Sequence, residues 1–168
     1  MTTTTTSRFR APEKKRLHLV MRDSSVLEAT IVVTDDMALV TFLATRKGGW
    51  MNTQDVRDPK VDGVAAHVAL QTDLIALASA PDANMTVVAT AGSGVAPRPV
   101  EVRLLGGQTL RGGLAIAAQQ RLSDFLAQAG RFVGLTDAVV LPNGAHLGDV
   151  AVNTTAIRAV VERQAGEA

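Results

Sequence analysis

The sequence contains no cysteine, and this absence removes several classes of chemistry. Without thiols the chain has no disulfide framework, no thiolate nucleophile and no zinc–thiolate site. Its three histidines, His18, His67 and His146, do not align between the two copies of the repeat described below, whereas a metal site needs several ligands in one place. We therefore expect no catalytic, cofactor-binding or metal-binding residues.

Aromatic residues are also scarce, at 3% of the chain, with no tyrosine. Hydrophobic residues nevertheless make up 46% of the sequence, which is typical of a folded protein because disordered chains lack the apolar surface to offset chain entropy. The cores must then be built from valine, leucine, isoleucine and alanine. Small cores of small side chains bury a modest area, so we expect packing between lobes or between subunits.

The chain has almost no net charge, with 17 basic and 16 acidic residues. This balance disfavours nucleic acid as the main partner, because phosphate binding requires a basic surface. The basic residues concentrate near the N-terminus, at Arg8, Arg10, Lys14, Lys15 and Arg16. We interpret this cluster as part of a solvated arm, with a tether to an anionic lipid or nucleic acid as the alternative.

No apolar run reaches the length of a membrane span, and the threonine-rich N-terminus has no apolar signal core. Residues 1–15 are expected to form a flexible arm, and the protein is expected to be cytoplasmic.

The sequence does contain an internal repeat, which is a strong indicator of architecture. Five residues recur after 83 positions: Leu27, Leu39, Phe42, Leu43 and Ala44 as Leu110, Leu122, Phe125, Leu126 and Ala127. Six more recur after 82 positions: Gly48, Asp55, Val68, Ala69, Thr72 and Ile75 as Gly130, Asp137, Val150, Ala151, Thr154 and Ile157. The repeat predicts two lobes, residues 16–80 and 99–163, with a linker at 81–98 and a tail at 164–168.

Each copy shows the same succession of patterns. Alternating apolar residues predict a hairpin at the start, with turns at 23–25 and at Gly106-Gly107. A leucine, a phenylalanine and a leucine then share one helical face in each copy, and we expect these trios to plug the two cores. Strands follow at 50–56, 64–70 and 74–78, and at 132–139, 146–152 and 157–161.

This pattern resembles the Sm-like small β-barrel, a strongly bent five-stranded relative of the SH3 barrel. The resemblance is closest in residues 100–112, which are similar to that family's first hairpin, and in residues 149–160, which are similar to its last. The stretch Arg121-Leu122-Ser123-Asp124-Phe125-Leu126 also resembles a bacterial domain family without an assigned activity. The implied fold is mainly β, with two tandem five-stranded barrels that each carry a short helical insert.

The residues by which Sm-like proteins contact RNA are not matched. The position of their aspartate–asparagine pair is occupied by the helical insert, and their last hairpin carries a basic motif where this chain has Gln71-Thr72 and Asn153-Thr154. The repeated Asp55 and Asp137 are interpreted as caps of turns or backbone amides rather than as acid–base groups.

We therefore expect a non-enzymatic interaction or scaffold subunit that associates with itself or with another protein through its barrel edges. Candidate contact residues are Trp50, Val139, Val140 and Leu141. For Trp50, burial in the first lobe is the expected outcome and an exposed interface position the alternative. Two other functions remain open, namely a nucleic-acid-binding regulator of Sm-like type and a small-molecule sensor using the cleft between the lobes.

Overall fold

The computed structural model describes residues 11–34, 36–82, 85–89 and 94–163. Within them the protein is mainly β, as predicted. The first half contains β1 (Glu13–Met21), β2 (Val26–Val33), α1 (Leu39–Ala44), η1 (Lys47–Gly49), β3 (Trp50–Arg57), β4 (Ala65–Gln71), η2 (Thr72–Leu74) and β5 (Ile75–Ser79). The second half contains β6 (Arg98–Leu104), β7 (Thr109–Leu114), α2 (Leu122–Gln128), β8 (Phe132–Leu141), β9 (Ala145–Asn153), η3 (Thr154–Ala156) and β10 (Ile157–Glu162).

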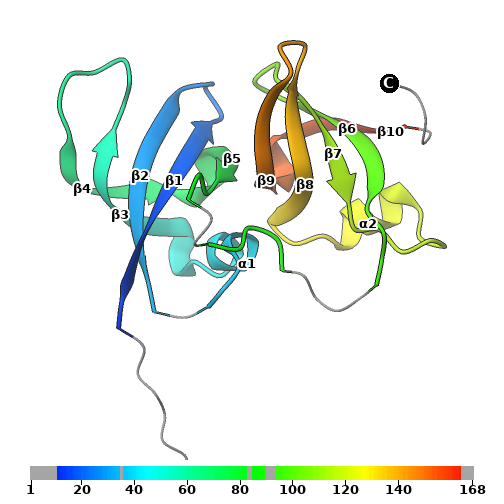
Figure 1. Ribbon diagram of the computed structural model, residues 1–168, viewed down its shortest axis with the longest axis horizontal. Coiled ribbons are helices and arrows are strands. Elements are labelled where there is room, and N and C mark those ends of the chain that lie inside the picture. The colour runs from blue at the N-terminus through cyan, green and yellow to red at the C-terminus, as the bar shows by residue number, and fades with distance from the viewer. Residues whose placement is uncertain (1–10, 35, 83–84, 90–93, 164–168) are drawn as a thin grey trace, which may run out of the picture.

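All ten of these strands form one antiparallel sheet in the order β10-β6-β7-β8-β9-β5-β1-β2-β3-β4. We call β1 to β5 lobe 1 and β6 to β10 lobe 2. Each lobe places its last strand beside its first and then runs in chain order, and the two lobes join where β5 pairs with β9 (Figure 1). The sheet does not close, so β4 and β10 are its end strands.

The strands form where apolar and polar residues alternate. In β1 the side chains of Leu17 and Leu19 are fully buried, and those of their neighbours Arg16 and His18 face solvent in whole or in part. The turn that follows is stabilised by Asp23, whose carboxylate accepts from the Ser25 amide at 2.9 Å and from its hydroxyl at 2.6 Å. These bonds favour the charged carboxylate and lower the pKa of Asp23.

The repeated aspartates mark a bulge in the third strand of each lobe. Asp55 and Asp137 have left-handed backbones, with φ of 51° and 49°, a conformation that aspartate tolerates better than most residues. The β8–β9 register shifts at Asp137, whose amide donates to the Asp149 carboxylate at 3.1 Å. Both repeated aspartates therefore lie at a strand bulge, which is a structural position, and their role as caps of turns or backbone amides stays a prediction.

The buried residues form two clusters, one centred on each lobe. In α1 the predicted trio is buried, with Leu39 and Leu43 at 0% exposure and Phe42 at 6%. In α2 the corresponding trio is half-exposed, and the helix contains no buried residue. The trio of α1 thus plugs a core as expected. In α2, Leu122 and Phe125 pack against the lobe 2 cluster but remain half-exposed, so this trio covers its core without being enclosed by it.

The start of lobe 1 differs from the sequence prediction. β1 begins at Glu13, within the expected N-terminal arm. In the predicted linker, the carbonyls of Thr86 and Val87 accept from the amides of Leu39 and Val40 at 2.9 and 3.1 Å. The linker therefore packs against the start of α1. The expected tail at 164–168 lies outside the described residues.

Candidate interaction site

The two lobes are joined by a short stretch of strand pairing. Leu77, Ala78 and Ser79 of β5 lie opposite Val152, Ala151 and Val150 of β9. All six residues are buried. The junction is therefore a strand-pairing contact between the two lobes of one chain.

Side chains cross this junction in both directions. Leu77 of lobe 1 belongs to the buried cluster of lobe 2, whereas Phe132 and Ala151 of lobe 2 belong to the cluster of lobe 1. Phe132 begins β8 and is 3% exposed. The start of β8 also packs against α1, which explains why the apolar face of that helix is buried.

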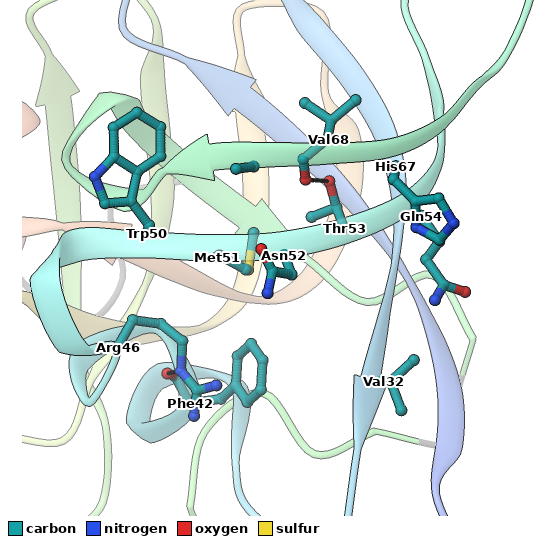
Figure 2. Close-up of a pocket in the computed structure, with 11 residues that line it drawn as sticks. Val32, Phe42, Arg46, Trp50, Met51, Asn52, Thr53, Gln54, His67 and Val68 are labelled. Carbon is teal, nitrogen blue, oxygen red and sulfur yellow. Dashed lines mark hydrogen bonds between the residues drawn. The ribbon is translucent and has the colours of Figure 1, made fainter.

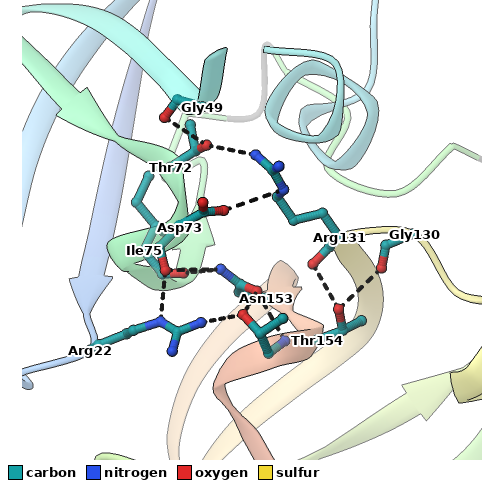
Figure 3. A network of polar contacts seen from close by, with 10 residues as sticks. Arg22, Gly49, Thr72, Asp73, Ile75, Gly130, Arg131, Asn153 and Thr154 are labelled. Atoms are coloured by element: carbon teal, nitrogen blue, oxygen red, sulfur yellow. Dashed lines mark hydrogen bonds and ion pairs between the residues drawn. The ribbon is translucent and has the colours of Figure 1, made fainter. Parts of the chain in front are cut away.

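A buried asparagine fixes the end of the junction (Figure 3). The side-chain Nδ2 of Asn153 donates to the carbonyl of Ile75 at 2.9 Å, and its side-chain oxygen accepts from the backbone amide of Thr155 at 3.0 Å. Asn153 is fully buried, so these bonds satisfy a polar group that would otherwise be costly to bury.

Two arginines extend this network toward solvent (Figure 3). Arg131 of lobe 2 lies 3.3 Å from the Asp73 carboxylate of lobe 1 and donates to Thr72 at 3.3 Å. Arg22 of lobe 1 donates to the Asp73 carbonyl at 2.6 Å and also to the hydroxyl of Thr155 in lobe 2. The rim is thus polar around an apolar centre, as in many protein interfaces.

The two end strands of the sheet, β4 and β10, are the counterparts of the two strands that pair at the junction. Among the described residues, β4 pairs with β3 and β10 pairs with β6. β4 corresponds to β9 in the repeat, and β10 corresponds to β5. The two open edges are thus counterparts of the two edges that pair at the internal junction.

A groove of about 620 Å³ lies beside the β4 edge (Figure 2). Phe42, Arg46, Trp50, Asn52 and His67 are among the residues that line it. The Arg46 guanidinium stacks over the Phe42 ring at 4.0 Å, and Trp50 is 55% exposed. Exposed aromatic and arginine side chains in a concavity are typical of protein contact sites.

The predicted contact residues fall in different places. Trp50 lies at the groove and is exposed, so the expectation that its ring is buried in lobe 1 is wrong. Val139, Val140 and Leu141 lie within β8, half-buried, and pair with neighbouring strands rather than forming an edge. Strand addition is consequently unavailable at these three residues.

The basic cluster is divided by the structure. Arg8 and Arg10 lie outside the described residues, and Lys14, Lys15 and Arg16 lie in β1 rather than in an arm. The buried Lys15 contacts Glu13 at 2.6 Å, and Arg16 contacts Asp82 at 3.1 Å. Lys15 and Arg16 thus have acidic partners within the fold.

The histidines are not brought together. His18 lies 3.4 Å from Glu28, His67 is in the groove and His146 is on β9. Over the described part of the chain, no group of three or more histidine and acidic residues has the arrangement of a metal site. Within the same residues, none of the helices has the length and apolar character that crossing a membrane requires.

The groove and the β4 edge were missed by the sequence analysis, apart from Trp50. The sequence feature that could have indicated them is the alternation of apolar and polar residues in β3, where exposed Asn52 follows buried Met51. That alternation shows one polar face but does not show that the next strand is the last of the sheet. The chain matches no known protein family, no curated protein and no solved structure.

Proposed function

We propose that this protein is a non-enzymatic interaction subunit, a scaffold that docks partners by strand addition at the open edges of its sheet. The observation that carries the proposal is the pairing of β5 with β9, because there the same kinds of edge already bind each other. An open edge offers a row of backbone donors and acceptors, and such rows readily pair with a further strand.

We also propose that the two lobes derive from one Sm-like unit. Two features support a common origin: the shared order of strands and the left-handed aspartates at corresponding bulges. Two backbone hydrogen bonds at corresponding positions also support a common origin. The Arg22 amide donates to the carbonyl of Leu74 at 2.8 Å, and the Leu105 amide donates to that of Ala156 at 2.9 Å, 82 or 83 positions later.

The other two functions have less support. The nucleic-acid function needs free cations, but Lys15 and Arg16 are engaged with Glu13 and Asp82. The sensor function needs a cleft between the lobes, where strands and apolar side chains are packed. A groove of about 460 Å³ between the linker and β9, lined in part by Met85 and Leu147, is the place that would serve it.

The test is capture of partners by edge variants. The immobilised protein is compared with the double variant Ala69→Lys/Ala159→Lys, which puts a charge on each open edge, and with Ala65→Lys. Ala65 is a matched control because it lies on β4, on the same face as Ala69, and is also exposed.

Native lysate from the source cells, with added copies of the chain itself, supplies the partners for mass spectrometry. We expect the unmodified protein and Ala65→Lys to retain the same partner and the double variant to lose it. Recovery of the same proteins by all three would contradict docking at the edges.

A further inference from the structure

We propose that the occupant of the open β4 edge is a second copy of this chain, bound head to tail. In this arrangement β10 of the second copy pairs with β4 of the first, which repeats between chains the contact that β5 and β9 make within one chain. The inference rests on the proposed docking function and names its partner. It accounts for three differences between corresponding residues of the two lobes, and a fourth difference leaves a groove beside the same edge.

The first difference is in the strands themselves. Val150, Ala151 and Val152 of β9 are fully buried, whereas their counterparts on β4, residues 68–70, are exposed or half-exposed. Residues 77–79 of β5 are buried, whereas their counterparts on β10, residues 159–161, are half-exposed. Each open strand thus carries a sequence whose counterpart is covered.

The second difference is between two aromatic residues. Phe132 and Trp50 each begin the third strand of a lobe, and each lies opposite the last residue of the fourth strand, Asn153 or Gln71. Phe132 reaches across the junction and is 3% exposed, whereas Trp50 is 55% exposed. A second copy at β4 would cover Trp50 as lobe 1 covers Phe132.

The third difference is between the helices. α1 is buried under the start of β8, and α2, its counterpart in lobe 2, has no buried residue. In the head-to-tail contact α2 of the second copy receives Trp50 of the first, as α1 receives Phe132. Leu105, which is 59% exposed at the same end of lobe 2, corresponds to Arg22 at the junction.

The fourth difference is the groove. Gly134 of lobe 2 corresponds to Asn52 of lobe 1. The linker residue Val88 packs against Gly134 so closely that a Cβ on Gly134 would lie 2.4 Å from a Val88 methyl. In lobe 1 the corresponding surface is the open groove beside β4. The groove is therefore the uncovered counterpart of a surface that the linker covers in lobe 2.

The junction also sets the register between chains. Each residue of a β5–β9 pair can be replaced by its counterpart in the other lobe, 82 positions later for β5 and 82 positions earlier for β9. This replacement places Ala159 opposite Leu70, Val160 opposite Ala69 and Val161 opposite Val68. The two edges differ, so the contact is heterologous and can continue from chain to chain until a ring closes or a filament forms.

The experiment uses one charged variant per edge. Ala69→Lys blocks β4 but leaves β10 intact, and Ala159→Lys does the reverse. Mass is measured by light scattering after size separation, with Ala65→Lys as control and circular dichroism to check folding. Leu105→Glu, at an exposed side chain, replaces Ala159→Lys if that half-buried site does not tolerate lysine.

We expect the unmodified protein and Ala65→Lys to assemble beyond a dimer, and each edge variant to be monomeric. A mixture of the two edge variants should form one heterodimer and nothing larger, because only one intact edge of each kind remains. Self-association that survives in Ala159→Lys but not in Ala69→Lys would indicate β4–β4 pairing and overturn the head-to-tail contact.

A strictly monomeric unmodified protein would overturn the inference but leave the proposed docking function standing if another protein is captured in an edge-dependent way. If both edge variants assemble as the unmodified protein does, both the inference and the proposed function fail.

Discussion

Phe132 and Trp50 occupy corresponding positions but differ in burial, and their substitution should therefore differ in effect. Phe132→Ala removes a ring from the lobe 1 cluster and should lower the free energy of unfolding by about 3–5 kcal/mol. Trp50→Ala removes a side chain that is 55% exposed in the single chain, so its effect should be within about 0.5 kcal/mol.

Denaturant unfolding at a concentration where the chain is monomeric provides this comparison, and the slopes of the transitions show whether the same surface unfolds in each variant. Equal losses in Phe132→Ala and Trp50→Ala would show that the two positions are not distinguished by burial.

Glu101 links stability to pH. It is 5% exposed in β6, where hydrogen bonds first from Arg163 at 2.7 Å and then from Arg103 at 3.0 Å lower its pKa from the usual value of a glutamate. A depressed pKa means that the carboxylate stabilises the fold above its unfolded-state pKa, and that this stability is lost as pH falls through the folded-state value.

We predict that Glu101→Gln is less stable than the unmodified protein at neutral pH and that the difference shrinks as the pH falls from neutral into the acid range where the carboxylate becomes protonated. Melting temperatures across this range, with Asp62→Asn in the exposed β3–β4 loop as control, measure the effect. A difference that stays constant with pH would contradict the role of the charged Glu101.

At the scale of elements, the linker is held between α1 and β8. Gly134→Ala should displace Val88, because the added methyl would lie 2.4 Å from its side chain, and should cost about 1–3 kcal/mol. Val88→Ala combined with Gly134→Ala should recover part of that loss, since it removes the methyl groups that clash.

A double-mutant cycle of thermal or denaturant unfolding measures this coupling. Additive losses in the double variant would show that the linker does not pack on β8 at this position.

Most strands and helices could be predicted from the sequence, but which of them are buried and which are exposed could not. The alternation and the repeat place the strands to within a few residues, because period and turn chemistry are local properties. The apolar trios of α1 and α2 have the same spacing, yet Phe42 is buried and Phe125 is half-exposed. Burial depends on which neighbour covers the helix, and that neighbour is distant in the sequence.

The candidate site was less predictable for the same reason. Trp50 could be singled out as a rare residue, with exposure at an interface as one alternative. Ala69 carried no chemical signal at all. Its position at an open edge follows from the order of ten strands, which is set by the pairing of β5 with β9.

At the scale of the whole molecule, the sheet ends in two unlike edges that match the two edges of its own internal junction. The fold therefore contains the contact once, between β5 and β9, and also contains a counterpart of each of these strands, β10 and β4, at an open edge. Natural proteins usually protect long open edges. Here residues 68–70 and 159–161 are short apolar stretches, and in the proposed head-to-tail contact residues 159–161 of one copy cover residues 68–70 of the next without any new type of contact.

The most direct test of this account is a cysteine pair at Ala69 and Val160. The natural chain has no cysteine, so Ala69→Cys/Val160→Cys has no competing thiols. The counterpart pair, Ala78 and Ala151, lies directly opposite in the antiparallel junction. Residues opposite each other in such a pair are about 4.5–5.5 Å apart at Cα, within the range of a disulfide.

Oxidation of Ala69→Cys/Val160→Cys should give a ladder of disulfide-linked multimers on denaturing gels, and a mixture of the two single variants should give linked dimers only. The control pair Ala65→Cys/Val160→Cys, displaced along β4, should give little linkage. A ladder at the predicted pair but not at the control is the result expected of head-to-tail assembly, whereas equal linkage of both pairs, or none in an assembled protein, would contradict it.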